Sequence, residues 1–251
     1  MRTIAVTNQK GGSGKTTTTV NLAAALAESG KRTLVVDMDP QGSASKWLGA
    51  KASGTPLYDV LTEGEPLGTA VWATEFEGID LIPSTDSMTR LEKALANEVG
   101  AETIFRSELR KLEGEWDYVL LDCPPSLGLL ALSALTAADE VLVPVEASVM
   151  ALQGLASLTR TIQRVRDRLN PELHLGGIVV CRSRNTNLSK EVIERLRERF
   201  GESVYETPVR NNVRLAEAPS FGEPITVYDT GSIGATDYRA VAAEFIGRQI
   251  N

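Results

Sequence analysis

A run of ten residues near the start of the chain combines three glycines with two lysines and a pair of threonines. Residues 8–17 read Asn-Gln-Lys-Gly-Gly-Ser-Gly-Lys-Thr-Thr. Glycine leaves the backbone free to turn, so that successive N–H groups point inward at one phosphate. Lys15 adds a positive charge for the outer phosphates, and the Thr16 hydroxyl suits Mg²⁺ as a ligand. The run therefore predicts a nucleotide-phosphate site formed by Gly11, Gly12, Ser13, Gly14, Lys15, Thr16 and Thr17.

Three aspartates follow two apolar segments that have the composition of buried strands. Asp37 and Asp39 stand at and just beyond the end of Thr33–Asp37, and Asp122 ends Tyr118–Asp122. Parallel strands bring their carboxyl ends to one edge of a sheet, so we expect the three carboxylates beside the phosphates. Asp122 is placed to hold the water shell of Mg²⁺. Asp37 either assists it or caps the turn that follows.

Apolar, β-rich segments alternate with helical patterns along the chain. Strands that are apolar on both faces and separated by helices indicate a mainly parallel sheet with helices on both faces. We expect one doubly wound α/β domain of the P-loop NTPase type over residues 1–251. The predicted strands are Thr3–Thr7, Thr33–Asp37, Ile79–Pro83, Tyr118–Asp122, Glu140–Val145 and Gly176–Cys181. The predicted helices are Thr16–Ser29, Asp86–Asn97, Thr103–Leu112, Leu127–Thr136, Ala151–Leu169, Leu188–Phe200 and Ala235–Ile250, and Lys51–Gly78 is predicted to be irregular apart from a short helix near Leu57–Leu61.

The phosphate loop departs from the general pattern, which has a glycine six residues before the lysine. Gln9 occupies that position, and a second lysine, Lys10, precedes the glycines. The loop resembles the deviant Walker A motif of the ParA/MinD superfamily of ATPases. Residues 35–42, 118–126 and 212–220 resemble three further motifs of that family, in the family's order. The chain is most similar to the short Soj/ParA-type members, which have no helix-turn-helix extension.

This resemblance implies an ATPase that binds ATP and Mg²⁺ and forms a homodimer on ATP binding. It implies that Lys10 reaches across the dimer to the phosphates of the partner, and that Asp39 positions the attacking water. The implied catalytic set is Lys10, Lys15 and Asp39, and the implied metal set is Thr16, Asp37 and Asp122. Adenine recognition is expected near residues 208–212, where Asn212 keeps its place and Arg210 replaces the usual proline. A ParB-like centromere-binding protein or adaptor is the implied partner that stimulates slow hydrolysis.

The distribution of charge suggests where duplex DNA would bind. The whole chain has 26 basic and 33 acidic residues, for a net charge of −7, which by itself argues against a nucleic-acid binder. Residues 160–214, however, hold twelve Lys or Arg against seven Asp or Glu. Such a stretch can hold phosphates without reading sequence. It can equally form a self-paired helix face, with pairs such as Glu191–Arg195 and Glu194–Arg197. Arg184 and Arg214, expected in loops, are the stronger candidates for contact with non-specific double-stranded DNA.

Three classes of function remain, and the sequence ranks them. A partition ATPase comes first, with a chromosomal, plasmid or protein cargo such as a carboxysome. A MinD-like ATPase at the membrane surface needs an amphipathic tail, whereas residues 235–250 read as the last helix of the domain. An iron-protein reductase component needs cluster cysteines, and Cys123 and Cys181 form no CxxC pair. A dethiobiotin-synthetase-like ligase is not expected to carry Lys10. We expect a cytoplasmic, nucleoid-associated protein with no membrane partner and no signal peptide.

Overall fold

The apolar segments of the sequence form one seven-stranded sheet, with the strand order β3-β4-β2-β5-β1-β6-β7. The computed structural model describes residues 1–49, 54–148 and 150–248. All neighbouring strands are parallel except β3, which runs antiparallel to β4 at one edge. The strands are β1 Arg2–Val6, β2 Thr33–Asp37, β3 Trp72–Ala73, β4 Ile79–Ile82, β5 Tyr118–Asp122, β6 Glu140–Glu146 and β7 His174–Cys181.

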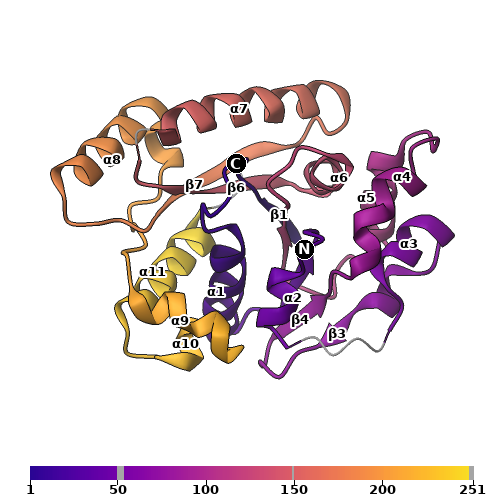
Figure 1. The fold of residues 1–251 in the computed structure, drawn as a ribbon, viewed down its shortest axis with the longest axis horizontal. Helices are drawn as coiled ribbons and strands as arrows, with labels where there is room; N and C mark the ends of the chain where they lie inside the picture. Colours follow the sequence, from indigo (N-terminus) through magenta and orange to yellow (C-terminus); the bar gives the residue numbers. More distant parts are fainter. Residues whose placement is uncertain (50–53, 149, 249–251) are drawn as a thin grey trace.

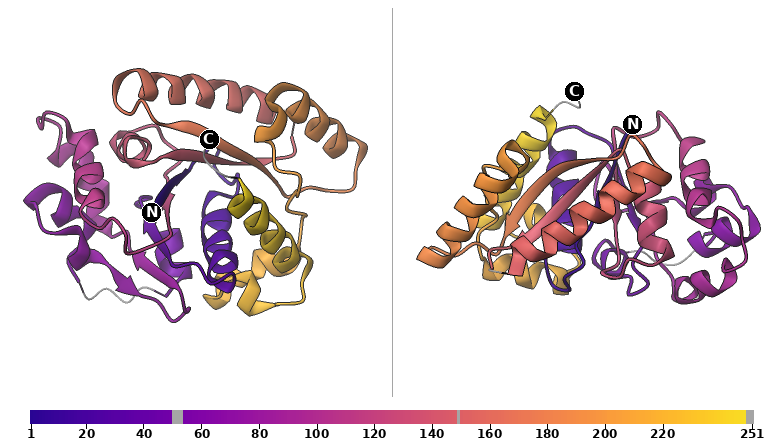
Figure 2. Two further views of the ribbon diagram at one scale, coloured as in Figure 1. Left: turned by 180° about the vertical axis from the view of Figure 1, so that it is seen from behind. Right: turned by 90° about the horizontal axis from the view of Figure 1, so that it is seen from above.

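Helices cover both faces of the sheet, and each face has its own apolar core (Figures 1 and 2). One core joins the sheet to α3 Leu57–Glu63, α4 Leu91–Ala94, α5 Ala101–Arg110, α6 Leu129–Ala137, α7 Met150–Arg168 and α8 Asn187–Phe200. The other joins it to α1 Lys15–Glu28, α2 Ser43–Trp47, α9 Val213–Phe221, α10 Ile225–Tyr228 and α11 Ile233–Gly247. The strands β2 and β5 are buried along their whole length because both of their faces are covered.

The predicted fold class is confirmed, and the six predicted strands all form, with ends that differ by at most two residues. The sequence missed β3, which has only two residues, and the α-helices α2, α9 and α10. The short helix near Leu57–Leu61 forms as α3. Residues 51–53 of the predicted irregular segment and residues 249–250 of the predicted last helix lie outside the described residues. That residues 1–251 form a single domain stays a prediction.

The predicted helix Asp86–Asn97 is wrong as one element. The chain instead forms a 3₁₀ turn at Asp86–Arg90, followed by the short helix α4. The Thr89 hydroxyl donates to the Asp86 carbonyl at 2.7 Å, and the hydroxyls of Thr85 and Ser87 bond to each other at 2.6 Å. Such short polar side chains compete with the helix for backbone partners, which explains the tighter first turn.

Parallel register places the ends of three strands together at one edge of the sheet. Asp37 of β2 and Asp122 of β5 are direct neighbours, and Val6 of β1 lies on the other side of Asp122. The phosphate loop starts just after β1 and leads into α1. The fold therefore brings the loop and the aspartates to the same place, as the sequence predicted.

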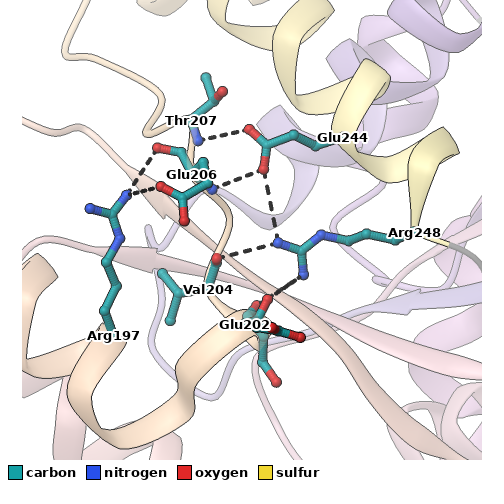
Figure 3. Close-up of polar contacts among 8 residues, drawn as sticks. Arg197, Glu202, Val204, Glu206, Thr207, Glu244 and Arg248 are labelled. Carbon is teal, nitrogen blue, oxygen red and sulfur yellow. Dashed lines mark hydrogen bonds and ion pairs between the residues drawn. The ribbon is translucent and has the colours of Figure 1, made fainter.

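The C-terminal helix α11 holds residues 202–207, which run beside β7 toward this edge (Figure 3). Glu244 of α11 accepts from the backbone N–H groups of Glu206 and Thr207, each at 2.8 Å. Arg248 donates to the carbonyls of Glu202 and Val204, at 2.9 and 3.3 Å. These bonds fix residues 202–207 to α11. None of the helices within the described residues is both long and apolar enough to cross a bilayer.

Candidate functional site

The backbone of the phosphate loop requires two of its three glycines. Gly12 has φ 71° and Gly14 has φ 94°, a left-handed conformation that other residues rarely adopt. A Cβ added at Gly11 or Gly12 would meet no atom within 4 Å. The space above these two residues is therefore open to a ligand, while Gly14 lies against Cys181, whose Sγ would be 3.6 Å from an added Cβ.

Lys15 is the first residue of α1, directly behind the loop. The residue is 8% exposed, and no hydrogen bond or ion pair joins its ammonium group to another described residue. The hydroxyl of Ser13 is likewise buried without a partner within the described part of the chain. A phosphate over the loop would give the Lys15 ammonium group the anion that it does not meet among the described residues.

Asp122 and Asp37 are both fully buried at the ends of adjacent strands. Burial, together with the charge of the nearby Asp37, raises the pKa of Asp122 to about 8, although the Thr16 hydroxyl and Lys15 act in the opposite direction. The Thr19 hydroxyl donates to Asp122 Oδ1 at 3.3 Å, whereas Oδ2 has no partner among the described residues. A buried carboxylate with one oxygen left over fits a bound cation.

The oxygens of Asp37 are used by the turn that follows it. Oδ2 accepts from the backbone N–H and the hydroxyl of Ser45, at 2.8 and 2.6 Å, and Oδ1 accepts from the Asp39 N–H at 3.2 Å. Burial raises the pKa of Asp37 to about 6, against the effect of the Ser45 hydrogen bonds. These contacts are the turn-capping role that the sequence left open, so any role of Asp37 toward a metal would act through its charge.

Asp39 lies half-buried at the rim, where Oδ1 accepts from the Gln41 N–H at 3.0 Å. No three His, Cys, Asp or Glu side chains of the described residues gather as a ready metal site. Mg²⁺ is usually bound through one or two protein oxygens together with substrate phosphates and water. Asp122, with the Thr16 hydroxyl nearby, is the set that fits it here.

Lys10 differs from Lys15 in both exposure and pairing. Its Nζ lies 2.8 Å from Oε2 of Glu146 at the end of β6, with the two side chains 49% and 36% exposed. The hydrogen bond from Lys10 lowers the pKa of Glu146, and the positive charges of Arg182 and Arg184 act in the same direction. Sequence reasoning missed Glu146 because it lies 136 residues from Lys10.

A cavity of about 80 Å³ adjoins the end of the loop, between Gly14, Thr17 and the segment 209–216. It is the expected region of adenine recognition, but the two residues predicted to contact the base already form hydrogen bonds or ion pairs within the protein. The guanidinium of Arg210 pairs with the buried Asp237, and its backbone N–H donates to the same carboxylate at 2.8 Å. Asn212 caps α9 by accepting from the Arg214 N–H at 2.8 Å, which leaves its amide nitrogen free to donate to a ligand.

The two arginines predicted to contact DNA differ in their surroundings. Arg184 lies in a loop as predicted, but the loop predicted for Arg214 is wrong, because Arg214 lies in the first turn of α9. Arg184 is exposed, and its guanidinium has no partner among the described residues, whereas Arg214 pairs with Glu217 at 3.1 Å and Asp229 at 3.5 Å. The predicted pair Glu191–Arg195 forms at 2.6 Å, but Arg197 pairs with Glu206 rather than with Glu194. We therefore expect Arg184 to be the more available of the two for phosphates.

Comparison with known families and proteins agrees with this site. Residues 1–175 match the model of a family described as an AAA domain. The chain is 45% identical to the chromosome partitioning protein ParA of Myxococcus xanthus, over 98% of this chain and 88% of that protein. It is 43% identical to the sporulation initiation inhibitor protein Soj of Bacillus subtilis, over 96% of each.

A solved structure supports the fold at similar coverage. The crystal structure of a cobyrinic acid a,c-diamide synthase from Mycobacterium smegmatis, with a bound ATP analogue and magnesium, superposes with a TM-score of 0.85. It is 34% identical to this chain and covers 98% of this chain and 94% of its own. The protein in that crystal binds the two ligands that the present loop and Asp122 fit.

Proposed function

We propose that this protein is a ParA-type partition ATPase that hydrolyses ATP slowly. The chain belongs to the ParA/MinD superfamily of deviant Walker A ATPases. The observation that carries the proposal is the contrast between its two loop lysines. Lys15 is buried and has no partner within the described residues, while Lys10 is exposed and held by a single carboxylate. Lys15 is thus available for a phosphate of the nucleotide bound in its own subunit, and Lys10 can leave its carboxylate and bind a phosphate in a second subunit.

Within one subunit, the residues of the loop bind and orient the triphosphate. The N–H groups around Gly11 to Gly14 and the ammonium of Lys15 meet its charges. A bound Mg²⁺, held by Thr16 and Asp122, would neutralise charge on the outer phosphates. Asp39 at the rim positions the attacking water and accepts its proton. Asp37 supports this arrangement by fixing the turn that carries Asp39.

Between subunits, Lys10 is the residue proposed to reach the phosphates of the partner, so that ATP joins a homodimer. Its pair with Glu146 must open for this to happen. An ion pair as exposed as this one contributes at most about 1 kcal/mol, so phosphates of a second subunit can replace the carboxylate at little cost. In the monomer, Lys10 is therefore paired with Glu146, and this weak pair can open when the dimer forms.

The ATP-bound dimer is proposed to bind double-stranded DNA without sequence preference, through Arg184 and the neighbouring basic residues of α8. A ParB-like centromere-binding protein or adaptor would stimulate hydrolysis and so release the dimer from the nucleoid. The partition assignment is supported by the two curated relatives, which are more similar to this chain than the amide synthase is. The alternative cargo is a protein assembly rather than a chromosome or plasmid.

The dimer step is tested by replacing the two partners of the Lys10–Glu146 pair. Lys10→Ala should bind ATP with an affinity within about twofold of wild type, yet fail to dimerise. Glu146→Gln frees Lys10 in both subunits, so the dimer should form at a protein concentration lower by up to about thirtyfold, which is the most that two exposed ion pairs of about 1 kcal/mol each allow. Analytical ultracentrifugation with ATP and Mg²⁺, under conditions of slow turnover, measures both effects. A Lys10→Ala variant that dimerises as wild type does would contradict the cross-subunit role.

A further inference from the structure

One arginine at the nucleotide edge has a backbone conformation that its side chain does not favour. Arg182, the residue after β7, has φ 52°, and it is the only residue other than glycine with a positive φ in the described ranges 1–49, 54–148 and 150–248. In this region the Cβ of an L residue crowds the following carbonyl, so such outliers persist only where the surrounding structure imposes them. They gather at ligand-binding sites.

The surrounding backbone does impose this conformation. Before Arg182, the Val180 carbonyl accepts from the Val209 N–H at 2.8 Å. After it, the Ser183 N–H donates to the Val209 carbonyl at 3.0 Å, and the Ser183 carbonyl accepts from the Asn211 N–H at 2.9 Å. The chain is thus paired on both sides of Arg182, which forms a kink between two fixed points. That kink turns Arg182 out of the ladder at the mouth of the cavity beside the phosphate loop.

The side chain of Arg182 has no polar partner among the described residues. Arg182 is exposed, and its guanidinium makes no hydrogen bond or ion pair to any other residue in the part of the chain that the structure describes. It lines the 80 Å³ cavity together with Gly14, Thr17 and Asn212. The nearby Arg210, by contrast, is held by Asp237 through its Nε and Nη2. Arg182 is the guanidinium that remains for a ligand at this place.

The size of the cavity indicates which part of a nucleotide the arginine would meet. A pocket for a small ligand usually measures about 300 Å³ or more, so this cavity can hold only an edge of a purine. The rest of the base would lie across the mouth, where its flat face is open to a planar cation. A guanidinium group stacks well on such a face.

We propose that Arg182 is a base-binding residue, whose guanidinium covers the adenine of the bound nucleotide. This inference rests on the proposed function, since it takes ATP as the ligand of the loop. It also explains why a strained arginine stands where asparagine or glycine would fit the backbone more easily. Because the contact is to the base, it is made equally with ATP and with ADP.

The test uses Arg182→Asn, because asparagine tolerates a left-handed backbone and removes the guanidinium. We expect the affinities for ATP and ADP to fall by the same factor, about tenfold, which corresponds to the loss of one desolvated cation–π contact. The affinity for inorganic triphosphate, which has no base, should stay unchanged. The melting temperature without nucleotide should be unchanged or higher. Calorimetric titration and thermal unfolding measure these quantities, and Arg110→Asn, at the exposed end of α5, controls for the loss of one surface charge.

Each other result overturns the inference. An unchanged ATP affinity would show that Arg182 does not contact the nucleotide, and an equal loss of triphosphate affinity would make it a phosphate ligand. A melting temperature that falls together with the affinity would assign it a structural role. If the wild-type protein bound neither ATP nor triphosphate, the proposed function itself would fail, whatever the variant did.

Discussion

Replacing Lys15 by alanine is expected to lower the affinity for ATP at least a hundredfold. Lys15 as a whole residue is 8% exposed, and no described residue pairs with its ammonium group. In the complex it would make charge-assisted hydrogen bonds to the outer phosphates, which contribute about 1.5–3 kcal/mol each. The loss of two such bonds corresponds to a factor of a hundred or more, at tenfold for each 1.4 kcal/mol. Isothermal titration with ATP and Mg²⁺ measures the change.

The matched control is Lys15→Met, which keeps most of the side-chain length without the charge. Lys15→Met should unfold at a temperature no lower than wild type, because no described residue forms a hydrogen bond or ion pair with the ammonium group in the free protein. A Lys15→Ala variant that binds ATP as tightly as wild type would remove the loop from nucleotide binding altogether.

Asp39→Ala is expected to abolish turnover while it leaves ATP binding intact. Asp39 lies at the rim, half-buried, and its Oδ1 accepts from the N–H of Gln41, while its Oδ2 has no hydrogen-bond partner among the described residues. A group that positions the attacking water and accepts its proton contributes typically 10²–10⁴-fold to the rate. The hydrolysis rate should therefore fall by about that factor, and the ATP-bound dimer should accumulate. Phosphate release and size-exclusion chromatography follow the two effects.

Asp39→Asn separates the charge from the turn, because the amide oxygen can still accept from the Gln41 N–H. We expect this variant to be as inactive as Asp39→Ala. Activity close to wild type in Asp39→Asn would show that Asp39 acts only by shaping the turn, and would move the role of positioning water to another residue.

The sheet could be predicted from the sequence because its strands are buried on both faces and therefore read as continuous apolar runs. Thr33–Asp37 and Tyr118–Asp122 form with the predicted ends. The segment Asp86–Asn97 was harder, since Thr85, Ser87 and Thr89 bond to each other or to nearby backbone rather than to solvent. Their competition with the helix cannot be read from helical periodicity.

The loop and Asp122 could be predicted because their residues are close in sequence or end neighbouring strands. The contact partners of individual side chains could not be predicted, because they lie far away in the sequence. Lys10 meets Glu146 and Arg210 meets Asp237 across 136 and 27 residues. The conformation of Arg182 is set by backbone bonds to Val209 and Asn211, which leave no pattern in the sequence.

Coupling between ATP and DNA is the central claim of the proposed function. A monomer with a net charge of −7 presents few free cations beside its acidic residues. Two subunits joined by ATP would roughly double the number of phosphates neutralised, and affinity rises steeply with that number. Arg184→Glu should weaken DNA binding and leave ATP binding unchanged. Arg110→Glu, which changes the charge equally on α5, should not weaken it.

The most direct measurement is the fluorescence anisotropy of unrelated DNA duplexes with ATP, with ADP and without nucleotide, over a series of salt concentrations. We predict binding with ATP alone, equal for every duplex sequence, and an affinity that falls linearly with salt on a double logarithmic plot. Equal affinity in the three nucleotide states would contradict the coupling of ATP to DNA binding.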